Sequence, residues 1–224
     1  MAREVLPNVL VVFFPKALVN SYIVQADVPT LIDTGTPGAA GHLVKALRAA
    51  GHEPAEVGRI ILTHRHADHA GNVAELARLT GAEVHVSPGD APFVVEAREQ
   101  PVPKPTSLLG RALVPYVKVA LPWTLDPVQA QPNLVDGATV GPFRVIETAG
   151  HTGGHVSLLW EEQGILFTGD AAQNITGVAP HFAADNPQQA HTTFERLREL
   201  ELDSACFGHG RTLRSGARER FRAS

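Results

Sequence analysis

Four potential metal ligands lie within six residues of this chain, directly after a short apolar run. The segment reads Thr63-His64-Arg65-His66-Ala67-Asp68-His69, and residues 59–62 before it have the composition of a strand. Imidazole and carboxylate groups are ligands that zinc, iron and manganese take in proteins. Polar groups at this density leave water at a high cost unless a cation compensates them. The cluster therefore predicts a catalytic metal centre. The ligands would lie on a loop that follows the end of a strand.

Composition narrows the class of protein. The 224 residues suffice for one large domain, or two fused halves, with a buried core. The net charge is −4 and no basic run alternates with aromatic residues, so nucleic acid is not expected as a partner. The single cysteine, Cys206, excludes a disulfide within the chain and suits a reducing compartment. The first residues lack a signal-peptide pattern and no apolar stretch approaches 18 residues, so we expect a cytoplasmic protein without a membrane span.

The first half of the chain alternates predicted strands and helices. Apolar runs bounded by turn residues predict strands over residues 9–14, 21–25, 30–33, 59–62 and 83–86. Helical spacing of apolar residues predicts helices over 39–50 and 71–80, which end at Gly51 and Gly81. Strand–helix alternation of this kind argues for a layered α/β fold.

The second half returns to strands and then to helices. The pattern predicts strands over residues 138–146, 155–160, 164–168 and 204–207. Helices are expected over 187–200, with Asn186 as its cap, and over 212–222. Each half runs through strands to a loop with ligand-type residues, a pattern consistent with two similar halves packed face to face.

Residues 88–132 interrupt this order with a proline-rich segment. We interpret it as a cap or lid inserted into a single domain of residues 1–224, with a helix around 108–118. Its aromatic residues, Phe93, Tyr116 and Trp123, either line a substrate pocket or form a small core within the cap.

Three further residues have the type and placement of metal ligands. His151 follows the predicted strand 143–148, Asp170 ends an apolar run, and His209 follows the last strand. Each is flanked by glycine or follows a strand, so that a rigid element aims the side chain. With the first cluster this makes seven ligands, enough for two ions. The proposed division is His64, His66 and His151 on one ion, Asp68, His69 and His209 on the other, and Asp170 between them.

These motifs resemble the metallo-β-lactamase superfamily. The pattern His64-x-His66-x-Asp68-His69 is followed by His151, Asp170 and His209 in the order and comparable spacing of that family. The segments 31–35 and 150–155 also fit, and the resemblance runs from about residue 18 to residue 210. It implies a four-layer αβ/βα sandwich of two mixed β-sheets with outer helices, and metals at one open edge.

Other polar residues receive more modest roles. Asp33 either orients a ligand imidazole from behind or caps its turn, and His155 is expected to brace the loop of His151. His181 and Phe182 either reach the substrate pocket or are ordinary loop residues. Arg65 and Ala67 should point away from the ions, and Cys206 should pack in the core. The remaining histidines are expected on the surface or in the core: His42, His52, His85 and His191.

The predicted activity is hydrolysis of a small ester, lactone or thioester by a metal-activated hydroxide. Two divalent ions, most simply zinc but with iron or manganese as alternatives, would lower the pKa of a shared water. Asp68 would hold the nucleophile and carry its proton to the leaving group. The expected partner is a small-molecule substrate, and the protein is expected to be a monomer or a homodimer.

Departures from individual branches of the family leave alternatives open. A thioesterase of the glyoxalase II kind would carry Gly-x-x-Gly-Arg shortly after Asp170 and a C-terminal helical domain, whereas only fifteen residues follow His209. A persulfide dioxygenase with one iron has the same motif, and it too should carry the Gly-Arg element. Homoserine-lactone lactonases have a tyrosine soon after the bridging aspartate, where this chain has Gln173 in the neighbourhood, and exported β-lactamases commonly differ at Asp170. A scaffold that binds ligands without turnover is the non-enzymatic alternative.

Overall fold

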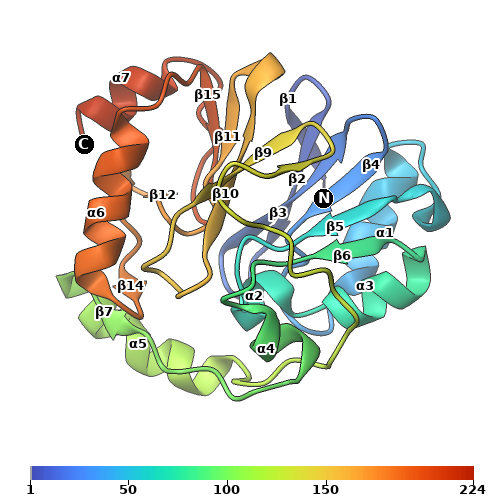
Figure 1. The fold of residues 1–224 in the computed structure, drawn as a ribbon, viewed down its shortest axis with the longest axis horizontal. Helices are drawn as coiled ribbons and strands as arrows, with labels where there is room; N and C mark the ends of the chain where they lie inside the picture. The colour runs from blue at the N-terminus through green and yellow to red at the C-terminus, as the bar shows by residue number, and fades with distance from the viewer. Residues whose placement is uncertain (1) are drawn as a thin grey trace.

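Two β-sheets packed face to face form the centre of the molecule, with helices on both outer sides (Figure 1). The structure, a computed structural model, describes residues 2–224. Both sheets are mixed, because each contains parallel and antiparallel pairs. The predicted four-layer αβ/βα sandwich is therefore confirmed.

The first sheet has the strand order β1-β2-β3-β4-β5-β6. Its strands are β1 (Arg3–Leu6), β2 (Val9–Phe14), β3 (Val19–Gln25), β4 (Pro29–Ile32), β5 (Arg59–Ile61) and β6 (Glu83–His85). Hairpins join β1 to β4, whereas β4, β5 and β6 run parallel. Parallel neighbours need a crossover, which α1 (Ala40–Ala49) and α3 (Val73–Thr80) provide on the outer face.

The second sheet has the order β15-β11-β10-β9-β8. Its strands are β8 (Thr139–Val140), β9 (Phe143–Glu147), β10 (Val156–Trp160), β11 (Ile165–Phe167) and β15 (Ser204–Cys206). The parallel pair β11 and β15 is connected through α6 (Pro187–Arg198), which begins where the Asn186 side chain accepts a hydrogen bond from the amide of Gln189. The C-terminal helix α7 (Ala217–Arg222) lies beside α6.

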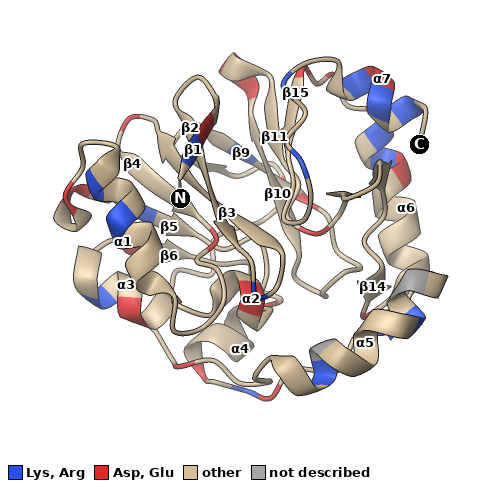
Figure 2. Ribbon diagram, turned by 180° about the vertical axis from the view of Figure 1, so that it is seen from behind, with Lys and Arg blue, Asp and Glu red and all other residues tan. Residues whose placement is uncertain are grey.

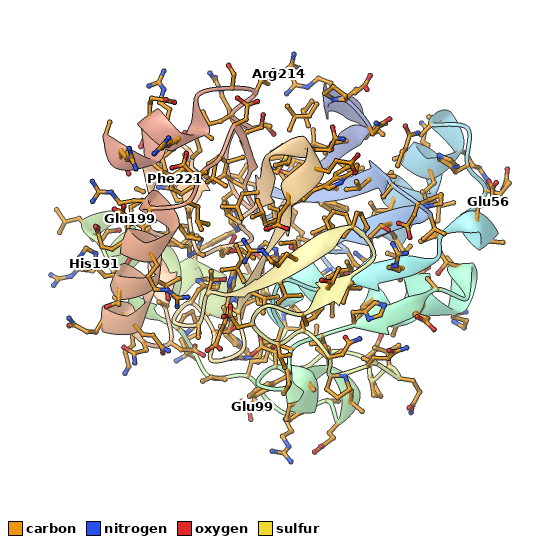
Figure 3. All side chains as sticks on the ribbon, turned by 45° about the horizontal axis from the view of Figure 1, so that its top comes forward. Glu56, Glu99, His191, Glu199, Arg214 and Phe221 are labelled. Carbon is orange, nitrogen blue, oxygen red and sulfur yellow. The ribbon has the colours of Figure 1, made fainter. Side chains whose placement is uncertain are left out.

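Three apolar layers hold these elements together. The first lies between the helices α1 and α3 and the first sheet, and includes Leu43 and Leu76. The second lies between the two sheets, and the third lies between the second sheet and α6 and α7. In the third layer the rings of Phe207 and Phe221 stack with centroids 5.9 Å apart, and Figure 3 labels Phe221 on α7. The central strands β3 and β10 are buried on both faces, so their apolar runs need not alternate.

The carboxyl ends of several strands meet at one edge of the sandwich. The loops that follow β4, β5, β9, β11 and β15 all begin there, and they carry Asp33, His64, His151, Asp170 and His209. The loop after β5 was expected to be irregular, but residues Ala67–Ala70 form the short helix α2. This turn of helix places Asp68 and His69 close to His64 at the start of the same loop.

The segment 88–132 lies along the same edge. It contains α4 (Ala91–Val95), β7 (Lys104–Pro105) and α5 (Leu108–Ala120), and Figure 1 shows α4 and α5 on the side of α2. The strand β7 pairs with β14 (Ala183–Ala184), while β12 (Gln173–Asn174) pairs with β13 (Val178–Ala179). The predicted helix is present, although Pro115 lies inside it. Its function as a cap stays a prediction.

Several elements differ from the sequence prediction: the predicted strand 138–146 is divided into β8 and β9, and α4, β7, β12, β13 and β14 were not predicted. The first strand, β1, was not predicted, and the last helix begins at Ala217 rather than Thr212 because Leu213 pairs with Ala205 of β15 and Gly216 then starts the helix. Short 3₁₀ helices occupy Pro54–Glu56 and Glu161–Gln163.

Figure 2 shows charges of both signs on α3, α6 and α7. Over residues 2–224 no helix has the length and apolar character needed to cross a membrane.

Candidate metal centre

Histidine and aspartate side chains from both halves of the chain converge at this edge. Four sets of three residues have ligand-type atoms within 4.8 Å of one another. The sets are His64, His66 and His151; His64, His69 and Asp170; Asp68, His69 and His209; and His151, Asp170 and His181. All seven residues predicted as ligands are thus brought together, and one more, His181, joins them. Every member except the half-buried Asp68 is buried.

Asp170 lies at the middle of the cluster. Its Oδ2 atom is 3.3 Å from Nε2 of His209 and 3.4 Å from Nε2 of His69, His151 and His181. These separations exceed the normal range of an N–H···O hydrogen bond, about 2.7–3.2 Å. Two ligands about 2.1 Å from one ion at a tetrahedral angle lie about 3.4 Å apart. The geometry therefore matches ligands around a shared cation better than hydrogen-bonded pairs.

Several buried polar atoms in the cluster lack a hydrogen-bonding partner among the described residues. They are Nε2 of His64, His66, His69 and His181, and Oδ1 of Asp170. Buried polar atoms are nearly always paired, so a group of orphans at one point calls for an explanation. Nitrogen and carboxylate donors suit divalent cations, and the residues present therefore fit a metal centre.

The rings are oriented by hydrogen bonds on their outer nitrogen. Nδ1 of His69 lies 2.8 Å from Oδ2 of Asp33, and Nδ1 of His151 lies 2.8 Å from the carbonyl oxygen of Ala183. Nδ1 of His209 lies 3.0 Å from the carbonyl oxygen of Leu18. A ring that donates its Nδ1 proton outward presents the Nε2 lone pair inward, as metal-binding histidines do.

Asp33 supports the first ligand loop from below. Its carboxylate accepts hydrogen bonds from the amide and the hydroxyl of Thr63, both at 2.8 Å, as well as contacting His69. The Thr63 hydroxyl also lies 3.0 Å from Nδ1 of His64. Asp33 is buried and has a φ of 60°, a backbone conformation that non-glycine residues rarely adopt. Strain of this kind persists where the surroundings over-determine the position, here through hydrogen bonds to Thr63 and His69.

His155 has both ring nitrogens occupied. Nε2 accepts a hydrogen bond of 2.9 Å from the amide of Asp170, so Nδ1 carries the proton and donates it to the Thr148 hydroxyl at 2.7 Å. The ring therefore braces the base of the loop that carries His151, as expected, and it also holds the amide of Asp170. The backbone closes the same loop, because the Thr148 amide donates to the carbonyl of His155 at 2.9 Å.

Burial favours neutral imidazoles on one side of the cluster. It lowers the pKa of His66 to about 3, and it lowers the pKa of His64, His151 and His181 below the usual value. A neutral imidazole has a lone pair available for a cation.

The carboxylates have the opposite effect on the other side. Burial alone would raise the pKa of Asp68, but the neighbouring His69 and His209 outweigh it and lower that pKa to about 2. The pKa of Asp170 is likewise held well below its usual value by imidazoles, foremost His209 and His181. In return Asp170 and Asp68 overcome the effect of burial on His209 and raise its pKa to about 9.

A buried ion-pair network lies behind the first ligand loop. Arg65 points away from the cluster, as expected, and its guanidinium pairs with Asp90 at 2.6 Å and also with Asp185. Asp90 accepts further bonds from the Arg65 amide, the Thr152 hydroxyl and the Gly154 amide, at 2.7–3.1 Å. Sequence reasoning missed this role for Asp90, because the residue follows a Pro-Gly turn far from the ligand motifs and carries no pattern of its own.

An apolar pocket of about 160 Å³ opens onto the cluster. Four of the five residues predicted to contact substrate line it: Tyr116, Trp123, His181 and Phe182. The prediction for Phe93 is wrong, because its ring packs under the guanidinium of Arg65, 4.3 Å from Cζ to the ring centroid. The other lining residues include Leu113 and Val114 of α5, Leu18 and Ile175, while six residues of the cluster form the floor.

The other histidines and the cysteine lie elsewhere. His42, His52, His85 and His191 belong to none of the four sets. His42 and His191 are exposed, while Nδ1 of the buried His85 lies 3.2 Å from Oδ1 of Asn133. Cys206 is buried in the layer between the sheets, where burial raises the pKa of its thiol.

Comparison with known proteins finds a family whose sequence model matches most of this chain. The model of the family described as "Metallo-beta-lactamase superfamily" matches residues 15–209. The chain is 32% identical to the protein YobT of Bacillus subtilis (strain 168) in an alignment of 226 positions that covers 94% of this chain and 91% of that one. It is 30% identical over 201 residues to YflN, a probable metallo-hydrolase of the same organism, covering 80% of this chain and 74% of that one.

A relative with a more specific name matches only in part. A hydroxyacylglutathione hydrolase of Halorhodospira halophila is 29% identical over 158 residues, which is 70% of this chain and 48% of that protein. This chain therefore matches about half the length of that relative. Among solved structures, the metallo-beta-lactamase family protein TTHA1429 from Thermus thermophilus superimposes with a TM-score of 0.71 at 25% identity, over 98% of this chain and 79% of that one.

Proposed function

Because the chain belongs to the metallo-β-lactamase superfamily and is a metallo-hydrolase, we propose that it hydrolyses a small ester, lactone or thioester with an apolar acyl group. The observation that carries this proposal is the position of Asp170. Its Oδ2 atom faces four imidazole nitrogens at 3.3–3.4 Å, on the floor of an apolar pocket. Such a site combines a place for cations with a place for an apolar substrate.

Two divalent cations would be held by the seven predicted ligands. One would take His64, His66 and His151, the other Asp68, His69 and His209, and Asp170 would contact both. Each set of three has its ligand atoms within 4.8 Å, which supports this division. Mixed nitrogen and oxygen donors suit zinc, with iron and manganese as alternatives. When bound, the two cations supply Lewis acidity that activates water and polarises the scissile carbonyl.

Asp68 would orient the attacking water. It lines the pocket, is half-buried, and lies with Oδ2 3.6 Å from Nε2 of His209. The nearby imidazoles outweigh burial and hold its pKa at about 2, so the carboxylate is ionised and accepts hydrogen bonds at neutral pH. A base with so low a pKa takes up protons poorly, and we therefore assign Asp68 to holding the water rather than to storing its proton.

The pocket favours a neutral, apolar acyl or alkyl group. Leu113, Val114, Trp123 and Phe182 line it, while Lys16 is the basic side chain at its rim among the described residues. Phosphate esters are usually held by several arginine or lysine donors. A carboxylic ester, lactone or thioester therefore fits this lining better than a phosphodiester.

Hydrolysis of a glutathione thioester is the second candidate, because several relatives are named hydroxyacylglutathione hydrolases. The two candidates differ in what the thiol or alcohol part of the substrate must be. A glutathione thioester carries a charged tripeptide, whereas an apolar ester or lactone does not. A glutathione thioesterase should prefer the tripeptide over a simple thiol, and a pocket that selects the acyl group should not.

A substrate panel with metal analysis tests the proposal. Full-length protein loaded with zinc, iron or manganese would be assayed on aryl esters of two to eight acyl carbons, γ-lactones, S-lactoylglutathione and glutathione persulfide, with oxygen uptake recorded. We expect about two metal equivalents, turnover of esters or lactones that rises with acyl length, and loss of turnover in Asp170→Asn. Persulfide-dependent oxygen uptake with one iron, or no hydrolysis of any carbonyl substrate, would refute it.

A further inference from the structure

We propose that His181 is a further metal ligand, bound through Nε2 to the cation that His151 and Asp170 hold. The inference rests on the proposed function only for the presence of that cation. His181 follows β13 and precedes β14, outside all the ligand motifs that the sequence displays.

The ring of His181 lies against the cluster. Its Nε2 atom is 3.4 Å from Oδ2 of Asp170, the same separation that His69 and His151 have from that oxygen. Its ring centroid is 4.6 Å from that of His151, and the two rings are perpendicular. The residue is 7% exposed. It therefore occupies a position equivalent to that of the predicted ligands around Asp170.

One carbonyl group sets the tautomer of two rings. The carbonyl oxygen of Ala183 lies 2.8 Å from Nδ1 of His151 and 3.1 Å from Nδ1 of His181. A carbonyl oxygen has two lone pairs and can accept both protons. The alternative, in which the Ala183 amide donates to Nδ1 of His181, spans 3.4 Å and is longer than a normal hydrogen bond. His181 thus carries its proton on Nδ1.

The inner nitrogen of His181 is then an acceptor that faces another acceptor. Nε2 is buried, has no hydrogen-bonding partner among residues 2–224, and is directed at the Asp170 carboxylate. Placing two buried acceptor atoms this close together costs free energy unless a positive charge lies between them. A hydrogen bond from a protonated Nε2 would be shorter than 3.4 Å. A cation shared with Asp170 satisfies both atoms.

Residues of the segment 88–132 hold His181 in place. The Thr106 hydroxyl donates to the carbonyl of His181 at 2.6 Å, and the Thr106 amide donates to the carbonyl of Phe182 at 2.9 Å. A Cβ atom on Gly110 would lie 2.0 Å from the Phe182 carbonyl oxygen, so α5 approaches this loop closely. The wall of the apolar pocket and the metal centre are thereby connected through one residue.

Metal binding by matched variants tests the assignment. His181→Gln and His181→Phe remove the nitrogen donor. His191→Asn is the control, since His191 is exposed on the outer helix α6 (Figure 3) and belongs to none of the four ligand sets. Zinc and cobalt affinity would be measured by competition with a chromophoric chelator, cobalt coordination by visible absorption, and folding by circular dichroism. We expect the folded His181 variants to bind one equivalent at least about tenfold more weakly and to show an altered cobalt spectrum.

A second measurement uses only the wild-type protein, so its outcome does not depend on whether a variant folds. In wild-type protein labelled with ¹⁵N-histidine and loaded with ¹¹³Cd, each ligand nitrogen should couple to cadmium. We expect couplings to six histidines: His64, His66, His69, His151, His181 and His209. Coupling to the other five alone, or unchanged affinity and spectrum in folded His181 variants, would overturn the inference.

The two proposals can fail separately. Wild-type protein that hydrolyses esters while His181 variants keep full metal affinity refutes the role of His181 alone. Wild-type protein that binds cadmium through His181 but hydrolyses no carbonyl substrate refutes the proposed function alone.

Discussion

The guanidinium of Arg65 and the carboxylate of Asp90 form an ion pair of 2.6 Å in which both side chains are buried. Asp90 also binds Thr152 and Gly154, so this carboxylate joins the loop after β5 to the loop after β9. These loops come from different sheets and carry His64 and His151. The pair therefore aligns the two halves of the candidate metal centre.

Removing Asp90 should destabilise the protein strongly. Asp90→Ala removes the fully buried partner of the Arg65 charge and leaves it only the partly exposed Asp185, and breaking a buried pair typically costs about 3–5 kcal/mol. Urea denaturation of the metal-free protein measures this directly. Glu96→Ala is the control, because Glu96 pairs with Arg98 at 2.7 Å on the surface, where such pairs contribute about 0–1 kcal/mol. A loss below about 1 kcal/mol for Asp90→Ala would contradict the role we assign to the pair.

Gly208→Ala should weaken the metal centre, because the added methyl group would collide with side chains of the cluster. A Cβ atom at this position would lie 2.2 Å from Oδ1 of Asp170 and 2.7 Å from Cε1 of His69. Both side chains must move, so we expect weaker metal binding and a destabilisation of about 1–3 kcal/mol. Gly153→Ala is the matched control in another loop of the site, since nothing lies within 4 Å of its Cβ position. Calorimetric metal titration that gives equal affinities for the two variants would count against the packing argument.

The seven candidate ligands could be predicted from residue type and from their positions after strands. The groups that hydrogen-bond to these ligands and hold their loops could not be predicted from the sequence. The carbonyl of Ala183 and the carboxylate of Asp90 act through positions set by the tertiary fold, and any residue has a carbonyl. His155 braces the predicted loop through Thr148, but its second bond, to the amide of Asp170, was not foreseen because it depends on how β11 lies beside β10. Phe93 was misassigned, since the start of α4 turns it toward Arg65 instead of the pocket.

Metal affinity should rise with pH up to about 9. Asp170 and Asp68 overcome burial and raise the pKa of His209 to about 9, so at pH 7 its ring is protonated in the absence of a cation. A bound cation must displace that proton, and each released proton changes the affinity by about tenfold per pH unit. We therefore expect affinity to increase from about pH 6 to about pH 9 and then to level off with respect to this group. Titration calorimetry in buffers of different ionisation enthalpy measures the protons released, and release of none at pH 7 would refute the assignment.

Leu18→Asn should separate substrate binding from support of the site. Leu18 has a φ of 55°, which asparagine tolerates better than leucine, and its carbonyl contact with His209 survives the substitution. Its side chain is 59% exposed and lines the pocket, so the change removes apolar surface from the acyl site alone. At about 0.8 kcal/mol for each buried methylene, we expect KM for an octanoyl ester to rise about three- to tenfold, with kcat within about twofold and no loss of thermal stability. An acetyl ester has too few methylenes to gain from the apolar lining, so we expect it to keep its KM. Equal effects on the two esters would place the acyl group elsewhere.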